Sequence, residues 1–127
     1  MAPVAEGALS LTGTAVDNRA GGLIASNGAL LLKVDTLDNR AGELSSQQQV
    51  TVHGTRLDNS DGGKLLAGTR LALVLEQLIN RNQGLVFGQA LELRGAQLDN
   101  QRGTLGATDA LRVSLANPGG RQRRPAR

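Results

Sequence analysis

Asparagine recurs along this sequence at a nearly constant interval, and a polar side chain repeated in this way is the first candidate for chemistry. The interval alternates between 21 and 20 residues and places the series at Asn18, Asn39, Asn59, Asn80 and Asn100. Asparagine accepts a left-handed backbone, hydrogen-bonds its own main chain and can stack on copies of itself as an amide ladder. We interpret the series as a structural corner ladder, in preference to a ligand site.

Aspartate precedes asparagine in four of the five copies, at Asp17, Asp38, Asp58 and Asp99. Carboxylates stacked one strand spacing apart repel each other, so a cation such as calcium could lie between them. Against a metal site, Ile79 interrupts the row, and arginines stand within three residues of the asparagines at Arg19, Arg40, Arg81 and Arg102. We therefore expect corner chemistry here, with neither a metal nor a cofactor.

The residues that usually carry catalysis are scarce in this chain. It contains no cysteine and one histidine, His53, which excludes disulfides, thiolate zinc sites, cysteine nucleophiles and two-histidine metal sites. His53 falls on the outward phase of an expected strand, where a solvated histidine is more common than a catalytic base. The sequence therefore predicts no catalytic residue and no enzyme.

Short apolar segments follow each asparagine and must form the elements that position it. A glycine comes first, at Gly21, Gly42, Gly62, Gly84 and Gly103. An alternating segment then begins at Leu23, Leu44, Leu65, Leu85 and Leu105, and a second begins at Leu30, Val50, Leu71, Leu91 and Leu111. Apolar residues two positions apart are typical of strands with one buried face. The two sets predict two inward ladders.

Stacked copies of this unit predict an all-β parallel β-helix of about five coils of 20–21 residues, because one copy cannot bury its apolar side alone. Equal rungs favour aliphatic residues, in agreement with an aromatic content of 1%. We expect the single phenylalanine, Phe87, to point inward in phase with Ala25, Ala67 and Ala107, and Lys64 to be an extra residue before a strand. A leucine-rich repeat is disfavoured because a second strand, and not a helix, follows each asparagine.

We expect the chain to divide into a disordered lead over residues 1–6, the repeats over 7–116 and a disordered basic tail over 117–127.

The formal charge is +3 and the pI about 10.6, which would suit a nucleic-acid partner. Four of the 14 basic residues lie in the tail, however, and the remaining ten against 11 acidic residues leave the chain without its tail at −1. We therefore expect no nucleic-acid partner, and no apolar run is long enough for membrane insertion.

The repeat unit resembles that of filamentous haemagglutinin and related adhesins. The resemblance rests on residues 37–46, with the sequence LDNRAGELSS, and on residues 50–54, with the sequence VTVHG; it recurs five times between about residues 7 and 115. It implies a right-handed β-helix that forms part of the shaft of a very large exoprotein. Such proteins are exported by two-partner secretion, although neither a secretion domain nor a toxin domain is visible in this sequence.

The resemblance implies a structural shaft segment of a secreted adhesin displayed on the bacterial cell surface. The implied partners are an outer-membrane two-partner-secretion transporter and, through the full-length protein, receptors or glycans on host or neighbouring cells. The alternatives are the shaft of a contact-dependent growth inhibition effector and a β-helix module that binds or processes carbohydrate. Uncapped coils expose unpaired strand edges, so end-to-end self-association is also expected.

Overall fold

Eleven strands make up the described part of the chain, which in this computed structural model is residues 4–5 and 7–115. The strands are β1 (Val4–Ala5), β2 (Leu9–Asp17), β3 (Leu23–Ser26), β4 (Leu30–Asp38), β5 (Glu43–Ser46), β6 (Val50–Asp58), β7 (Lys64–Ala67), β8 (Arg70–Ile79), β9 (Leu85–Gly95), β10 (Gln97–Asp99) and β11 (Thr104–Leu115). No helix occurs among these residues, so none of them forms a helix that could cross a membrane.

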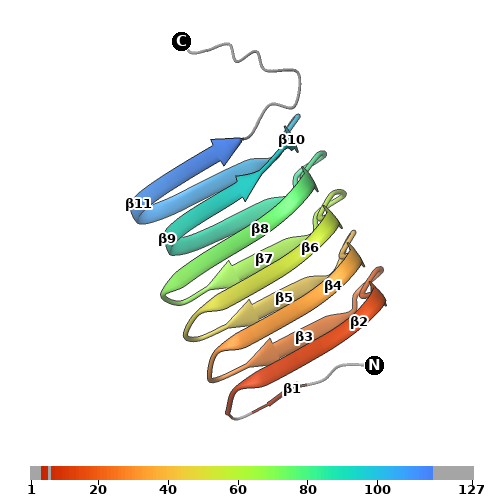
Figure 1. Cartoon of the computed structure of the whole chain (residues 1–127), viewed down its shortest axis with the longest axis vertical. Coiled ribbons are helices and arrows are strands. Elements are labelled where there is room, and N and C mark those ends of the chain that lie inside the picture. Colours follow the sequence, from red (N-terminus) through yellow and green to blue (C-terminus); the bar gives the residue numbers. More distant parts are fainter. Residues whose placement is uncertain (1–3, 6, 116–127) are drawn as a thin grey trace.

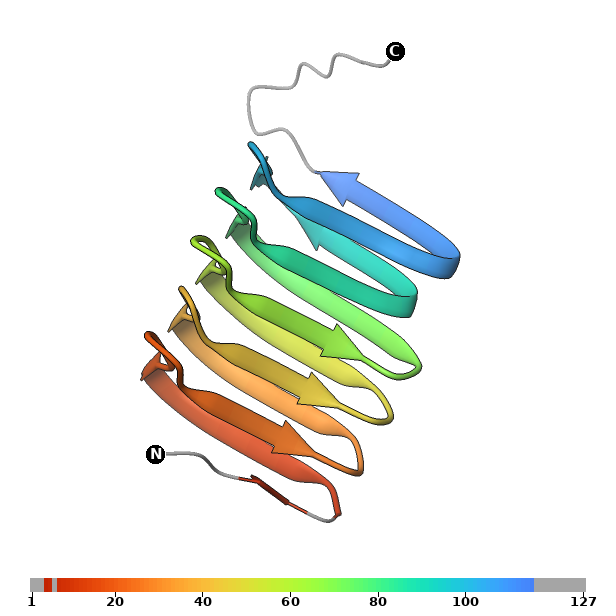
Figure 2. The same cartoon turned by 180° about the vertical axis from the view of Figure 1, so that it is seen from behind.

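Successive coils of the chain stack in parallel to form a β-solenoid of about five turns (Figure 1). One row of strands runs β1-β3-β5-β7 and a second runs β2-β4-β6-β8, and every pairing is parallel. The long strands β9 and β11 turn through both rows without a break, which joins all the strands into one sheet (Figure 2). The predicted parallel β-helix is therefore confirmed.

The second of the two predicted inward ladders is present as expected. Leu30, Val50, Leu71, Leu91 and Leu111 lie in register on five adjacent strands. The four interior rungs are at most 2% exposed. Side chains of similar size on every rung fill the space between the two rows, and their removal from water is the main favourable term in folding such a coil.

The first predicted ladder is wrong by one residue in two of its copies. The buried row is Ile24, Leu44, Leu65 and Val86, each at most 4% exposed, and it continues to Leu105. Leu23 and Leu85 are only half-buried on the outward side. The difference arises in the corner that joins each asparagine to the strand that follows it. This corner has four residues in some coils and three in others.

Corner length follows the number of residues that adopt a left-handed backbone. The longer corners hold two such residues, as at Asp61 (φ 55°) and Gly62 (φ 82°), whereas the corner at Ala41 (φ 58°) holds one. The additional residue in the third coil lies in this corner. Lys64 is therefore not the extra residue that we expected, since it pairs in register with Glu43 on one side and Leu85 on the other.

Phe87 points outward, contrary to our expectation. Because Val86 occupies the inward position of β9, its neighbour Phe87 lies on the opposite face of the strand and is 39% exposed. Its partners in register are Leu66 and Gly106. A Cβ atom on Gly106 would come within 3.1 Å of the Phe87 ring, so the ring lies against the glycine backbone of the next coil.

The glycine that follows each asparagine corner is required by a close approach between coils. A Cβ atom on Gly42 would lie 1.9 Å from the carbonyl oxygen of Asn18, and one on Gly103 would lie 1.7 Å from that of Asn80. No side chain fits at these distances. The register equivalents of Gly42 in the longer corners are Gly22, Gly63 and Gly84. Gly22 and Gly63 come one residue after the glycines singled out in the sequence, whereas Gly84 is the glycine singled out there.

The predicted lead contains a strand. Val4 and Ala5 pair in parallel with Ala25 and Ser26 to form β1. The rest of the lead, at residues 1–3 and 6, and the basic tail expected over 117–127 lie outside the described residues.

A charge in the buried ladder tests the inward assignment. Leu71 is 0% exposed, so Leu71→Asp should lower the free energy of unfolding by at least about 3 kcal/mol, measured by urea denaturation. The matched control is Val74→Asp on the same strand, because Val74 is 38% exposed and lies between His53 and Arg94. Equal losses of stability in the two variants would contradict the assignment.

Candidate functional site

The five asparagines form one continuous row along the corner of the solenoid. Each side-chain amide nitrogen donates to the side-chain oxygen of the next asparagine, at 2.7, 2.6, 2.9 and 2.8 Å from the first pair to the last. The residues are Asn18, Asn39, Asn59, Asn80 and Asn100. The first four are at most 4% exposed, so these amides bind one another in a site with little access to water.

Each amide also holds the strand that follows in the next coil. Asn18 Nδ2 donates to the Glu43 carbonyl at 3.0 Å, and Asn39 Nδ2 donates to the Lys64 carbonyl at 2.9 Å. Asn59 repeats the contact with the Leu85 carbonyl at 3.0 Å. Buried donors and acceptors that are satisfied in this way stabilise the fold, whereas unsatisfied ones are costly. The row therefore joins each corner to the next coil, and its polar atoms are engaged within the protein.

The aspartates and arginines form a second row on the exposed side of the corner. Asp17 and Arg19 make a bidentate pair at 2.9 and 3.0 Å, and Asp38 and Arg40 make another at 2.9 and 2.8 Å. Arg19 also reaches the carboxylate of the next coil, 3.7 Å from Asp38 Oδ2. Cations interleaved with the stacked carboxylates offset their mutual repulsion.

These pairs shift the acid–base equilibria of the carboxylates. Hydrogen bonds from the Arg19 side chain, followed by one from its backbone, hold the pKa of Asp17 below its ordinary value. The Arg40 side chain in the same way lowers the pKa of Asp38. Both carboxylates therefore stay ionised to lower pH than a free aspartate.

Two departures from the repeat are matched by shifts in pairing. Ser60 stands where an arginine is expected. The Asp58 carboxylate keeps the hydrogen bond from the backbone two residues further on, as in the other coils, and lies 4.0 Å from Nε of Arg40 in the preceding coil. Ile79 stands where an aspartate is expected, and Arg81 instead pairs with Asp99 at 3.0 Å. The arginine left by the missing carboxylate is thus paired with the next coil.

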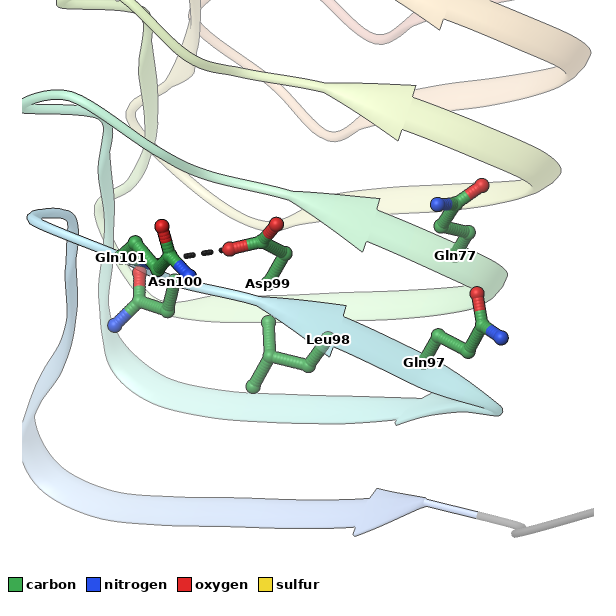
Figure 3. Close-up of a pocket in the computed structure, with 6 residues that line it drawn as sticks. All are labelled: Gln77, Gln97, Leu98, Asp99, Asn100 and Gln101. Atoms are coloured by element: carbon green, nitrogen blue, oxygen red, sulfur yellow. Dashed lines mark hydrogen bonds between the residues drawn. The ribbon is translucent and has the colours of Figure 1, made fainter.

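A polar hollow of about 630 Å³ lies beside the end of the row (Figure 3). It is lined by Gln77, Gln97, Leu98, Asp99, Asn100 and Gln101. Gln77 and Gln97 lie in register on one side, and the Asp99 carboxylate accepts from the Gln101 backbone at 3.3 Å on the other. Asp99 is the one ionisable group in the lining and is paired with Arg81. Within residues 4–5 and 7–115, no group of three or more histidine, aspartate or glutamate side chains is placed to hold a metal ion.

His53 lies apart from the corner. It is exposed on the outward face of β6, between Lys33 and Val74 in register. The structure does not bring it near the asparagine row or the Asp–Arg row, which occupy the far end of the same long strands.

Sequence reasoning missed a second set of buried polar residues at the opposite corner. Ser26 Oγ donates to the Gly28 carbonyl at 2.5 Å, and Ser46 Oγ donates to the same carbonyl at 2.6 Å. Both serines are at most 7% exposed and lie in register with each other and with Ala67. The available signal was a small residue at the end of each short strand, which marks a position where the chain turns sharply.

The fold and the corner define a β-solenoid built from stacked haemagglutinin-type coils. A sequence model of the haemagglutinin repeat matches residues 4–77 and again residues 76–117. The chain therefore belongs to the haemagglutinin repeat family, which confirms the resemblance to the filamentous haemagglutinin repeat. No curated protein and no solved structure shows significant similarity to it.

Replacement of one amide in the row tests its contribution to stability. Asn59→Asp keeps the shape of the side chain but removes the donor to Asn80 and Leu85 and brings a buried charge. We expect a loss of roughly 3 kcal/mol at neutral pH, with partial recovery in acid, where the protonated carboxyl regains one donor. Denaturant unfolding at both pH values measures the effect.

The control for that variant is Asn27→Asp, which makes the same chemical change at an exposed turn. It should alter stability little at either pH. A row that contributes nothing to folding would leave the two variants equally stable.

The second row predicts a pH-dependent effect of Asp38→Asn. The pKa of Asp38 in the folded chain lies below the ordinary value of 3.8, so its ionised form contributes stability above that pH. The contribution is lost as the pH falls through the folded-state pKa. The variant should be less stable by under about 1 kcal/mol at neutral pH and equal to the parent chain in strong acid. Melting curves across this range would contradict the pairing if the difference stayed constant.

Proposed function

We propose that this chain is a structural shaft segment of a large secreted adhesin, with no catalytic role of its own. The observation that supports this most directly is the continuity of the stack. The buried aliphatic ladders and the asparagine row pass through successive coils without interruption. Family membership supports the same function, because the haemagglutinin repeat is a structural adhesin repeat.

The geometry suits a spacer. Each added coil lengthens the solenoid by one strand spacing, about 4.8 Å. The backbone hydrogen bonds between coils run along the long axis, so a pulling force on the shaft is shared by many parallel bonds in each coil. A rod of this kind holds a binding or toxic domain away from the cell without itself contributing a binding site.

Surface display and its partners are part of this proposal. We place the full-length protein outside the cell, exported through an outer-membrane two-partner-secretion transporter. Receptors or glycans on host or neighbouring cells would be bound by the full-length protein. The cysteine-free composition suits export without disulfide formation.

The outward position of Phe87 bears on the carbohydrate-module alternative. Carbohydrate platforms use exposed aromatic rings, and Phe87 is the only phenylalanine, tyrosine or tryptophan in the chain. The residues in register beside it, Leu66 and Gly106, carry no polar side-chain atom to orient a sugar. The shaft function therefore remains the better supported.

A two-coil deletion tests the spacer function directly. Removal of residues 30–70 joins Ala29 to Leu71, which is in register with Leu30 through Val50. The shortened protein, expressed in the producing bacterium, should still be displayed and should still bind target cells. Flow cytometry with an antibody against the chain measures display on intact cells.

The possible outcomes of this experiment test the spacer function and surface display separately. Loss of target-cell binding while display persists would place the receptor site in this segment and overturn the spacer function. Antibody staining confined to lysed cells would contradict surface display. Bacterial competition assays with the same strains distinguish an adhesin from a growth inhibition effector, because the target of the latter is a neighbouring bacterium.

A further inference from the structure

The row of short strands forms one face of the solenoid, and its outward residues lie in two lines along the stack (Figure 2). The first line passes through β3, β5, β7 and the start of β9 and consists of Leu23, Glu43, Lys64 and Leu85. The second line passes through the same strands and consists of Ala25, Ser45, Leu66 and Phe87. All of these residues are half-buried or exposed, and coils added at either end of the stack would not cover them. Together they define the short-strand face.

The first line carries its charges at the centre and its leucines at the ends. Glu43 and Lys64 are adjacent in register. Neither of them forms a salt bridge with another residue of the described ranges 4–5 and 7–115. If the line is turned end for end and laid on itself, the glutamate meets the lysine, the lysine meets the glutamate, and each leucine meets a leucine.

The second line matches small residues with large ones in the same way. Ala25 and Ser45 form part of the lining of a hollow of about 500 Å³, which extends to Leu66. Phe87 follows Leu66 in register and is 39% exposed. If this line is turned end for end and laid on itself, Phe87 meets Ala25 and Leu66 meets Ser45. Each large side chain therefore meets a small one.

We propose that the short-strand face binds the same face of a second copy of this chain, with the two solenoids antiparallel. The two-fold axis runs parallel to the strands and passes between β5 and β7. It places each Glu43 opposite Lys64 of the other copy, and it places each Phe87 at the Ala25 end of the other copy's hollow. The contact is isologous, so it closes at two copies. This inference goes beyond the shaft function, which requires no second copy.

Other alignments of the face bring poorly matched residues together. An axis that passes through β5 would place Glu43 opposite its own copy, and one that passes through β7 would do the same to Lys64. With the two solenoids parallel, the first line of one copy would face the second line of the other. Glu43 would then lie opposite Ser45, and Lys64 would lie opposite the apolar Leu66. Matched charges of this kind fix the orientation of a complex more than they raise its affinity.

The corners beside the short-strand face permit the approach of the second copy. At the centre, Arg40 would lie opposite Ser60, which stands at a position where three of the other corners carry an arginine. Toward the ends, Arg19 would lie opposite Arg81 of the second copy. Each of these two arginines is already paired with an aspartate of its own chain, which reduces the repulsion between them.

Sedimentation velocity of the full 127-residue chain tests the proposal. Four coils of short strands cover about 19 by 13 Å, which is less than the roughly 800 Å² per partner of a stable interface. We therefore expect a weak dimer, seen as a mass that rises toward twice that of the chain over a concentration series extending to the millimolar range.

Loss of the aromatic ring should weaken the dimer without unfolding the chain. Phe87→Ala should raise the dissociation constant at least about tenfold, since buried aromatic residues dominate the energy of many interfaces. Its far-ultraviolet spectrum should match the parent, because the ring is exposed within one copy. The matched control is Val74→Ala, which shortens a side chain of similar exposure, 38%, on the long strand β8. The control should associate like the parent chain.

An exchange of charges tests the antiparallel orientation. Glu43→Lys and Lys64→Glu each bring like charges together across the axis, so each variant by itself should raise the dissociation constant at least about tenfold. An equimolar mixture of the two variants restores opposite charges at both positions and should form a mixed dimer. A defect in the folding of either variant could not produce this recovery.

Three results would overturn the proposal. They are a parent chain that is monomeric at every concentration, a Glu43→Lys variant that associates like the parent, and single charge variants that stay monomeric when they are mixed. None of these results would affect the shaft function, which is tested separately by display and target-cell binding of the shortened protein.

Discussion

Each coil of this protein is stabilised by its neighbours and not by itself, and the rest of the structure depends on that constraint. A coil of about 20 residues has no interior of its own, so its leucines become buried only when another coil lies above and below. The asparagine row imposes the same condition in polar form, because every interior amide takes its acceptor from the following coil. Stacking of coils thus buries the leucines and supplies the hydrogen-bond acceptors of the asparagine amides.

Identical residues placed one strand spacing apart create a problem that depends on their chemistry. Leucines on adjacent rungs attract one another, and amides can donate and accept in turn along a row. Ionised carboxylates repel one another and have no hydrogen to donate. The repulsion is offset by arginines, which pair with a carboxylate in their own coil and reach toward that of the next coil. Where an aspartate is replaced by Ile79, the adjacent Arg81 pairs instead with Asp99.

Much of the architecture could be predicted from spacing, and the errors share a cause. The strand pattern, the parallel stack and the inward ladder through Leu71 followed from periodicity, because strands with one buried face alternate. The ladder through Val86 and the direction of Phe87 did not. Both depend on whether a corner holds one or two residues with positive φ. A difference of one residue there exchanges the two faces of the strand that follows.

The glycines show the same limit. In the sequence, glycine near a corner indicates a turn, and Gly62 does adopt a positive φ. Gly42 and Gly54 are required for a different reason, namely that a carbonyl oxygen of another coil occupies the place of a side chain. That oxygen belongs to a residue about 20 positions away or more, so no local pattern indicates its approach.

The sequence by itself determined the repeat, the family, the aliphatic core and the series of asparagines, because these depend on residue type and interval. The tertiary structure decided which face each short strand buries, which carboxylate each arginine reaches and which coils accept only glycine. These features depend on distances of a few ångströms between segments that are a full coil apart along the chain.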